Sequence, residues 1–240
     1  MKLIIFDLDQ TLVDFISVHD EALRRLFRKF FSVDARFTEI DFAGKSFKES
    51  FHELAILKNV TEDVFQKKSH QLLESYETTF SETFPRDVAK YILPGAKELL
   101  RELAKTEHLM VLYTGDSPGV VARVLSATGL GKYFKFCLYG TEVKVRADMV
   151  RLAIDKAQKV TGQKFKGKNV IIIGDSIRDV ECGKLFDALT IAIATGFHSQ
   201  EELSKAGPDY LFRDLRDYKN VLEAIVREDK PSLLRTMYGR

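Results

Sequence analysis

The stretch Leu3-Ile-Ile-Phe-Asp7-Leu-Asp9-Gln-Thr11-Leu-Val-Asp14 begins as a strand and ends in acidic residues. Its first four residues form a short, β-branched apolar run, which is typical of a buried strand. Asp7 and Asp9 follow directly, and side chains two residues apart in an extended segment point the same way. Burying two carboxylates there is costly without a cation or strong donors. The stretch is therefore either a solvated loop or a functional site, and the rest of the chain decides which.

The composition is that of one soluble globular protein. A chain of 240 residues can form one large core, or one core with a smaller accessory domain. The net charge of +2 gives no case for nucleic acid or an acidic membrane surface as a partner. No apolar run approaches the about 20 residues of a membrane span, and no signal peptide opens the chain. We therefore expect a cytoplasmic protein in which Cys137 and Cys182 are buried thiols rather than a disulfide.

Residues 15–93 have helical periodicity and no strand signal. We expect three helices there, over residues 17–31, 46–57 and 61–80. Ser17 and Thr61 are the expected N-caps of the first and third helices. We expect the segment to form an all-helical domain inserted into the rest of the chain.

From residue 94 onward, strands alternate with helices. The expected strands cover residues 108–114, 134–139, 170–173, 189–194 and 209–212. The expected helices cover residues 94–104, 119–128, 147–161 and 177–186, one that opens at Ser199, and 217–227. This alternation predicts the α/β class, with a doubly wound parallel sheet built from residues 1–14 and 94–240.

Ligands bind such sheets at the carboxyl ends of the strands, so the polar residues at those ends are the candidate site. They are Asp7, Asp9, Thr114, Lys144, Asp175 and Asp179. Four carboxylates, one hydroxyl and one ammonium suit chemistry on a phosphate. The aspartates can hold Mg²⁺, and the cation with the lysine can neutralise a phosphoryl group.

These residues also resemble the four motifs of the haloacid dehalogenase superfamily, in the right order and after the right strands. The matches are Asp7-Leu-Asp9-Gln-Thr11, Thr114, Lys144-Val-Arg-Ala-Asp148 and Gly174-Asp175-Ser-Ile-Arg-Asp179. The helical insertion resembles the family's C1-type cap, found in its phosphatases of the phosphoglycolate phosphatase and β-phosphoglucomutase type. The resemblance covers essentially the whole chain.

The resemblance implies a role for each matched residue. Asp7 is the implied nucleophile, and Asp9 the general acid and then base. Thr114 and the backbone of Gly115 are implied to bind the phosphoryl group, with Lys144 as its cation. The implied Mg²⁺ ligands are Asp7, Asp9 through its carbonyl, and Asp175, with Asp179 in or near the shell. A small phosphorylated metabolite is the implied substrate.

Two departures and one cap residue bear on this reading. Val145 and Ala147 replace the prolines common in the third motif, which leaves the role of Lys144 intact. Asp116 stands where asparagine is common, either as an extra acid at the site or, as we expect, as the N-cap of the next helix. Lys45 lies where such caps often read the substrate, and it is the candidate cap residue.

The leading interpretation is a Mg²⁺-dependent phosphatase, with a phosphomutase of the same fold as the nearest alternative. Asp9 argues against a dehalogenase, which does not need that carboxylate, and Lys45 keeps a phosphonatase open. A phosphorylatable, receiver-like switch without turnover comes from a different class, and the long insertion argues against it. The substrate itself cannot be read from the sequence, and a monomer and a homodimer are equally open.

Overall fold

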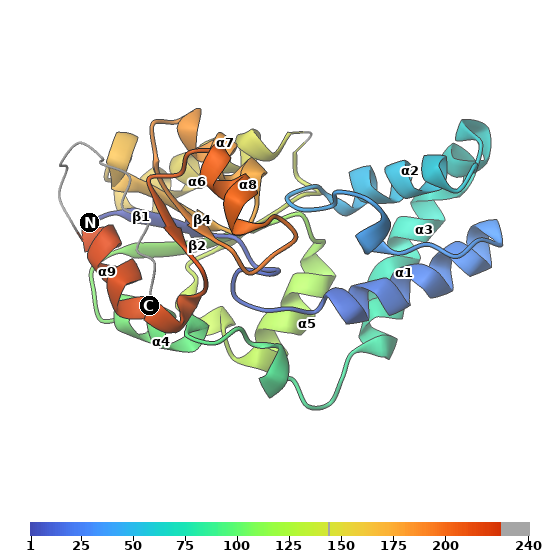
Figure 1. The fold of residues 1–240 in the computed structure, drawn as a ribbon, viewed down its shortest axis with the longest axis horizontal. Helices are drawn as coiled ribbons and strands as arrows, with labels where there is room; N and C mark the ends of the chain where they lie inside the picture. The colour runs from blue at the N-terminus through green and yellow to red at the C-terminus, as the bar shows by residue number, and fades with distance from the viewer. Residues whose placement is uncertain (144, 227–240) are drawn as a thin grey trace.

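The computed structural model describes residues 1–143 and 145–226. In this part of the chain a six-stranded parallel sheet is flanked by helices on both faces, and a group of long helices stands beside it (Figure 1). The strands are β1 (Leu3–Phe6), β2 (Leu109–Thr114), β3 (Cys137–Tyr139), β4 (Val170–Gly174), β5 (Leu189–Ile193) and β6 (Tyr210–Phe212).

The order of the strands makes β1 the centre of the sheet. The order is β3-β2-β1-β4-β5-β6, with every neighbouring pair parallel. The chain builds outward from β1 in one direction through β2 and β3, and then in the other from β4 to β6. A crevice opens at the carboxyl ends of strands where the direction of winding changes, and here that place is the end of β1.

The sheet is buried on both faces, which explains why its strands are continuous apolar runs. Ile4 and Phe6 of β1 pack in the core shared with α4 (Ala96–Leu103), α5 (Pro118–Thr128) and α9 (Tyr218–Val226). Leu3 and Ile5 pack in a second core with α6 (Arg146–Thr161) and α7 (Ile177–Lys184). A short helix, α8 (Gln200–Lys205), joins β5 to β6. Figure 1 shows α6, α7 and α8 above the sheet and α4 and α9 below it.

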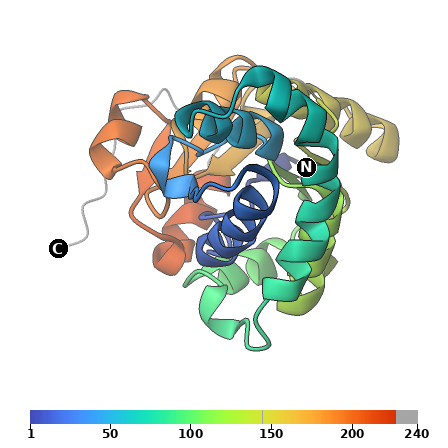
Figure 2. The same cartoon turned by 90° about the vertical axis from the view of Figure 1, so that its right-hand side faces the viewer.

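The insertion between β1 and β2 contains α1 (Ile16–Phe31), α2 (Phe47–Leu57) and α3 (Glu62–Thr83). Figure 2 looks onto this end of the molecule and shows the three helices in front of the sheet. Buried phenylalanines and Tyr76 fill the space between them. The two connections to the sheet run together, because Val13 bridges Ile92 and the N–H of Asp14 donates to the carbonyl of Tyr91 (2.7 Å).

The predicted fold class is confirmed, and most element bounds agree within two or three residues. The assignment of Ser17 as an N-cap was wrong. Phe15 holds that position, because the Asp14 carboxylate accepts the N–H of Ile16 (3.2 Å) and starts α1 earlier. The third strand is shorter than expected, since a 3-10 turn over residues 131–133 precedes it. Arg227, the expected end of the last helix, lies outside the described residues.

Two further predictions from the sequence concerned the state of the cysteines and membrane-spanning segments. Cys137 and Cys182 are both free, as expected; Cys182 is buried as predicted, whereas Cys137, also predicted to be buried, is half-buried. None of the described helices has the length and apolar character needed to cross a membrane.

Candidate active site

Asp7 and Asp175 lie side by side because they follow neighbouring strands. Phe6 of β1 pairs with Ile173 of β4, and the N–H of Asp7 donates to the carbonyl of Ile173 (2.9 Å). The Thr11 hydroxyl lies 3.3 Å from Oδ2 of Asp7 and 3.2 Å from Oδ1 of Asp175. All three side chains are buried. One hydroxyl group therefore links two carboxylates that have been removed from water.

Asp179 stands in the first turn of α7, and protein donors hold both of its oxygens. Oδ2 accepts the backbone N–H (3.0 Å) and the hydroxyl (2.6 Å) of Ser176 in a capping box. Oδ1 accepts the Tyr113 hydroxyl. A Cβ at Gly174 would lie 2.3 Å from the Asp179 carboxyl carbon, so only glycine allows this approach. The position of Asp179 is thus fixed by its own turn and by β2.

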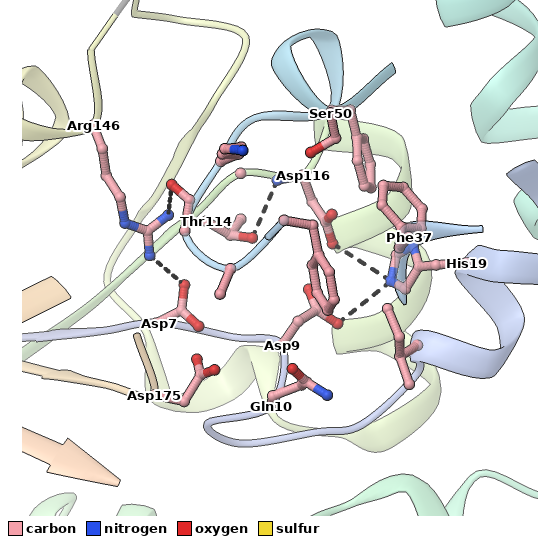
Figure 3. Close-up of a pocket in the computed structure, with 17 residues that line it drawn as sticks. Asp7, Asp9, Gln10, His19, Phe37, Ser50, Thr114, Asp116, Arg146 and Asp175 are labelled. Carbon is pink, nitrogen blue, oxygen red and sulfur yellow. Dashed lines mark hydrogen bonds and ion pairs between the residues drawn. The ribbon is translucent and has the colours of Figure 1, made fainter. Parts of the chain in front are cut away.

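Arg146 supplies positive charge to these acids. Its Nη2 lies 2.6 Å from Oδ1 of Asp7 and 2.6 Å from Oδ1 of Asp179, and its guanidinium stacks 4.3 Å from the centre of the Tyr113 ring. Charge-assisted bonds of this length are strong and fix geometry. We call Asp7, Asp175, Asp179 and Arg146 the Arg146 cluster; Figure 3 shows the contact with Asp7.

The sequence analysis assigned the cation to Lys144 and missed Arg146. Lys144 lies outside the described residues. Arg146 opens α6, two positions further on, and the start of that helix lies beside the ends of β1 and β2. A second basic residue in the same short motif was the available signal, since either side chain is long enough to reach the strand ends.

The acids of the Arg146 cluster are hard to ionise together. Burial raises the pKa of Asp7 to about 7, with Arg146 opposing the shift and Asp179 adding to it. Burial, and then the charges of Asp7 and Asp179, raise the pKa of Asp175 well above its usual range. Burial opposes ionisation of Asp179 as well, but the Arg146 charge and three donors bring its pKa below the usual value.

These properties fit a hard divalent cation. Oxygens of Asp7, Asp175 and Asp179 lie within 4.8 Å of one another. An all-oxygen, crowded and incompletely neutralised group is the setting that Mg²⁺ prefers. Asp7 and Asp175 are the better direct ligands, because Asp179 already accepts three hydrogen bonds from Tyr113 and Ser176 and two from the guanidinium.

Thr114 and Gly115 end β2 next to these acids. Thr114 is buried, and its Oγ1 accepts the N–H of Asp116 (3.2 Å). A Cβ at Gly115 would lie 2.1 Å from the carbonyl oxygen of Lys45, and the Gly115 carbonyl accepts the N–H of Phe47 (3.4 Å). The loop over residues 42–47 of the insertion therefore rests directly on the end of β2.

A second buried polar group lies on the other side of the same strand ends. His19 of α1 places Nε2 3.4 Å from Oδ1 of Asp9 and 4.0 Å from Oδ2 of Asp116. Its Nδ1 lies 2.8 Å from the hydroxyl of Tyr76 on α3. Figure 3 shows the imidazole pointing at both carboxylates. We call Asp9, Asp116, His19 and Tyr76 the His19 cluster, which joins the insertion to the sheet.

The expectation that Asp116 caps the next helix was wrong. Ser117 holds the N-cap position of α5, and Asp116 is buried against Asp9. Burial and the Asp9 charge raise the pKa of Asp116 well above its usual range. The pKa of Asp9 is lowered, because hydrogen bonding and charge from His19 outweigh its burial. Facing carboxyl groups lose protons one at a time, so Asp9 and Asp116 can share one proton, and Asp116 is the harder of the two to ionise.

His19 was not singled out from the sequence. It lies on the apolar face of α1 with Val18 and Ala22, and it is 3% exposed. A histidine on an otherwise apolar helix face, ten residues after a strand-end aspartate, was the available signal. Its meaning depends on α1 passing over that aspartate, which only the folded chain shows.

A cavity of about 60 Å³ lies between the two clusters. Asp7, Asp175 and Arg146 of the first cluster line it on one side, and Asp9, His19 and Asp116 of the second line it on the other (Figure 3). Lys45, the candidate cap residue, lines the same cavity, with its ammonium paired to Glu53. The remaining lining residues are Gln10, Ile16, Phe37, Phe42, Ala43, Gly44, Phe47, Ser50, Thr114 and Gly115.

Comparison with known proteins gives this arrangement a family. The sequence model of the haloacid dehalogenase-like hydrolases matches residues 4–193. Pyrophosphatase PpaX of Listeria innocua is 24% identical over 233 residues, which cover 95% of this chain and 97% of that protein. Phosphoglycolate phosphatase of Synechococcus elongatus is 24% identical over 228 residues, which cover 95% and 100%.

Solved structures agree with the fold. A hydrolase from Pseudomonas syringae superposes with a TM-score of 0.74, over 95% of this chain and 100% of that one. Its sequence is 21% identical, so this likeness shows the shared architecture alone.

Proposed function

Because the chain belongs to the haloacid dehalogenase-like hydrolases and is a phosphatase of that family, we propose that it hydrolyses a small phosphorylated metabolite with Mg²⁺, through a phosphoryl group carried on Asp7. The proposal rests on one observation: two strand-end carboxylates line one cavity with different partners. Asp7 contacts a guanidinium, and Asp9 faces an imidazole. The first suits attack on phosphorus, and the second suits proton transfer.

The reaction has two halves. An oxygen of Asp7 bonds to phosphorus while the bond from phosphorus to the leaving alcohol breaks, and Asp9 gives that alcohol the proton that it shares with Asp116. Asp9 then takes a proton from water, whose oxygen bonds to phosphorus, and Asp7 leaves as a carboxylate with release of inorganic phosphate. Two easier steps replace one difficult displacement.

The remaining residues bind the phosphoryl group and the metal ion. The Thr114 hydroxyl and the Gly115 N–H take phosphoryl oxygens, and Arg146 with Lys144 neutralises them. Asp7, the Asp9 carbonyl and Asp175 hold Mg²⁺, with Asp179 beside them. When bound, the ion supplies further positive charge to the transferring group.

The insertion, residues 15–93, acts as a C1-type cap in this proposal. Its loop over residues 42–47 excludes water while Asp7 reacts and must move to admit water afterwards. The connections at residues 12–15 and 92–95 are its hinges. We take the enzyme to be cytoplasmic, to act on free small molecules rather than nucleic acid or membranes, and to be a monomer or homodimer.

The test is phosphate release from p-nitrophenyl phosphate and a panel of small phosphate esters, with Mg²⁺ or with EDTA. We expect turnover with Mg²⁺ alone, and a loss of about 10⁴-fold or more in Asp7→Asn. Asp155→Asn, an acid-to-amide change at an exposed position of α6, is the matched control and should keep full activity. Activity that survives in Asp7→Asn, or without metal, contradicts the mechanism.

The same panel separates the phosphomutase alternative. A mutase converts one sugar phosphate into its isomer and releases little phosphate, whereas a phosphatase releases phosphate in proportion to the substrate consumed. Substrate consumption should therefore be followed together with phosphate release. Isomer formed without phosphate favours the mutase.

A further inference from the structure

The part of the cavity that faces the insertion is mainly apolar, unlike the part that faces the Arg146 cluster. Phe37, Phe42 and Phe47 give it apolar walls, and the polar groups among them are few. A single water molecule needs about 10–15 Å³ of such cavity volume, so a cavity of about 60 Å³ has room for only a small group. Since the phosphoryl group belongs at the Arg146 cluster, this part receives the leaving alcohol of the proposed reaction.

The buried polar atoms that face this space are mainly hydrogen-bond acceptors that lack a donor. Oδ1 of Asp9 and Oδ2 of Asp116 are buried and make no hydrogen bond in the described part of the chain. Their nearest donor is Nε2 of His19, at 3.4 Å and 4.0 Å. Ser50 is 2% exposed and lines the cavity with its hydroxyl-bearing side chain. Leaving such groups unpaired is costly, so a ligand that brings donors is favoured.

Each cation of the described lining is already paired with an acid. The Lys45 ammonium contacts Glu53, and the Arg146 guanidinium holds Asp7 and Asp179. His19 carries one imidazole between two carboxyl groups. An anionic leaving group would meet Asp9 and Asp116 with no unpaired cation among the described lining residues to offset them.

We propose that this phosphatase selects monoesters whose leaving alcohol carries hydroxyl or ammonium donors and no anionic group. The inference rests on the proposed function and adds the substrate class. Asp116 is its specificity residue, because its buried Oδ2 has no partner and can accept a donor, and because Asp9 and Asp116 together keep a negative charge that repels an anion. The aromatic walls of the cavity are also compatible with an ammonium group, which is attracted to ring faces.

The first test compares kcat/KM across small monophosphates that differ in the leaving group. Ethanolamine phosphate and glycerol 1-phosphate carry donors, ethyl phosphate carries none, and phosphoglycolate and pyrophosphate carry a second anionic group. We expect the two donor-bearing esters to exceed ethyl phosphate about tenfold and phosphoglycolate about a hundredfold. Phosphoglycolate or pyrophosphate hydrolysed as well as the donor-bearing esters overturns the inference and leaves the phosphatase intact. No metal-dependent turnover of any ester overturns the proposed function and the inference with it.

The second test changes the acceptor without changing its shape. Asp116→Asn should lower the ratio of kcat/KM for ethanolamine phosphate to that for phosphoglycolate about tenfold, while Asp155→Asn leaves the ratio unchanged. Glu53→Gln, at a position 43% exposed, should release Lys45 and raise kcat/KM for phosphoglycolate severalfold. This second variant tests the same charge balance if Asp116→Asn does not fold. Ratios that stay unchanged in both variants contradict the assignment.

Discussion

The two clusters that face the cavity start from the same residue type and differ in everything around it. Asp7 and Asp9 are two residues apart on one strand end; Asp7 is buried and Asp9 half-buried, and each lies beside further aspartates. Asp7 contacts Arg146, which carries a permanent charge, whereas Asp9 faces His19, which can gain or lose a proton. Surroundings rather than residue type therefore separate a carboxylate suited to attack from one suited to proton transfer.

The clusters also differ in where their members come from. The Arg146 cluster belongs entirely to the sheet and to the helices that follow its strands. The His19 cluster takes His19 and Tyr76 from the insertion, and Asp9 and Asp116 from strand ends. Binding of the phosphoryl group should therefore depend on the sheet alone, and proton transfer on how the insertion is seated. Three variants test that division.

The largest effect is expected at Arg146. Arg146→Ala removes the guanidinium that lies 2.6 Å from both Asp7 and Asp179, and leaves buried carboxylates facing each other. We expect kcat/KM for p-nitrophenyl phosphate to fall about 10³-fold, the scale of losing a charged group at a transferring phosphoryl group. Arg146→Lys should recover part of the loss, because it keeps the charge but not the two-pronged contact.

Lys144→Ala is the comparison that decides which basic residue acts. If Arg146 is the cation on Asp7, Arg146→Ala should cost more than Lys144→Ala. A larger loss from Lys144→Ala, with Arg146→Ala near wild type, would return the role to Lys144 as the sequence motif suggested. Thermal melting of each variant shows whether a lost activity reflects a lost fold.

A smaller effect is expected at His19, and it should depend on the leaving group. His19→Asn removes the imidazole that faces Asp9 and breaks its contact with Tyr76. We expect kcat for alkyl phosphates to fall about 30-fold, within the range seen when a partner that orients a catalytic group is lost. p-Nitrophenyl phosphate should be affected less, because its leaving group needs little protonation. An equal loss on both substrates contradicts a role in proton transfer, and exposed His70→Asn is the control.

The same division explains how much the sequence could predict. The acids of the Arg146 cluster were largely predictable, because Asp7 and Asp175 directly follow apolar strands, Asp179 lies in the first turn of the next helix, and parallel strands end at one edge of the sheet. Even there, the sequence analysis named Lys144 as the cation and not Arg146. Both basic residues lie in the third motif, and the sequence does not say which of them contacts the acids. The fold class needed only the alternation of strands and helices.

The His19 cluster could not be assembled from spacing alone. His19 and Tyr76 are 57 residues apart in the insertion, and their contact depends on how α1 and α3 cross over the strand ends. Asp116 was assigned to the helix start, which is the commonest place for an aspartate after a strand, and tertiary packing overrode that preference. Local pattern thus predicted the part of the site made by the sheet, and not the part made by packing the insertion against it.

The smallest effect is expected where the insertion is fastened to the sheet. Arg178 of α7 places Nη1 2.9 Å from Oδ2 of Asp41 and also donates to the carbonyl of Ala43, while Phe42 meets Phe197 edge-on at 5.6 Å. Arg178→Ala should loosen the loop over residues 42–47 without touching either cluster. Partly exposed ion pairs contribute about 0.2–1 kcal/mol, so we expect KM to rise about threefold. The comparison predicts where this loss appears: slow alkyl phosphates, which need the His19 cluster in place, should lose more than p-nitrophenyl phosphate. Arg151→Ala, at an exposed pair with Asp148, should change neither substrate. An equal change in kcat/KM for both substrates would mean that both clusters depend equally on the position of the insertion, which contradicts the division between them.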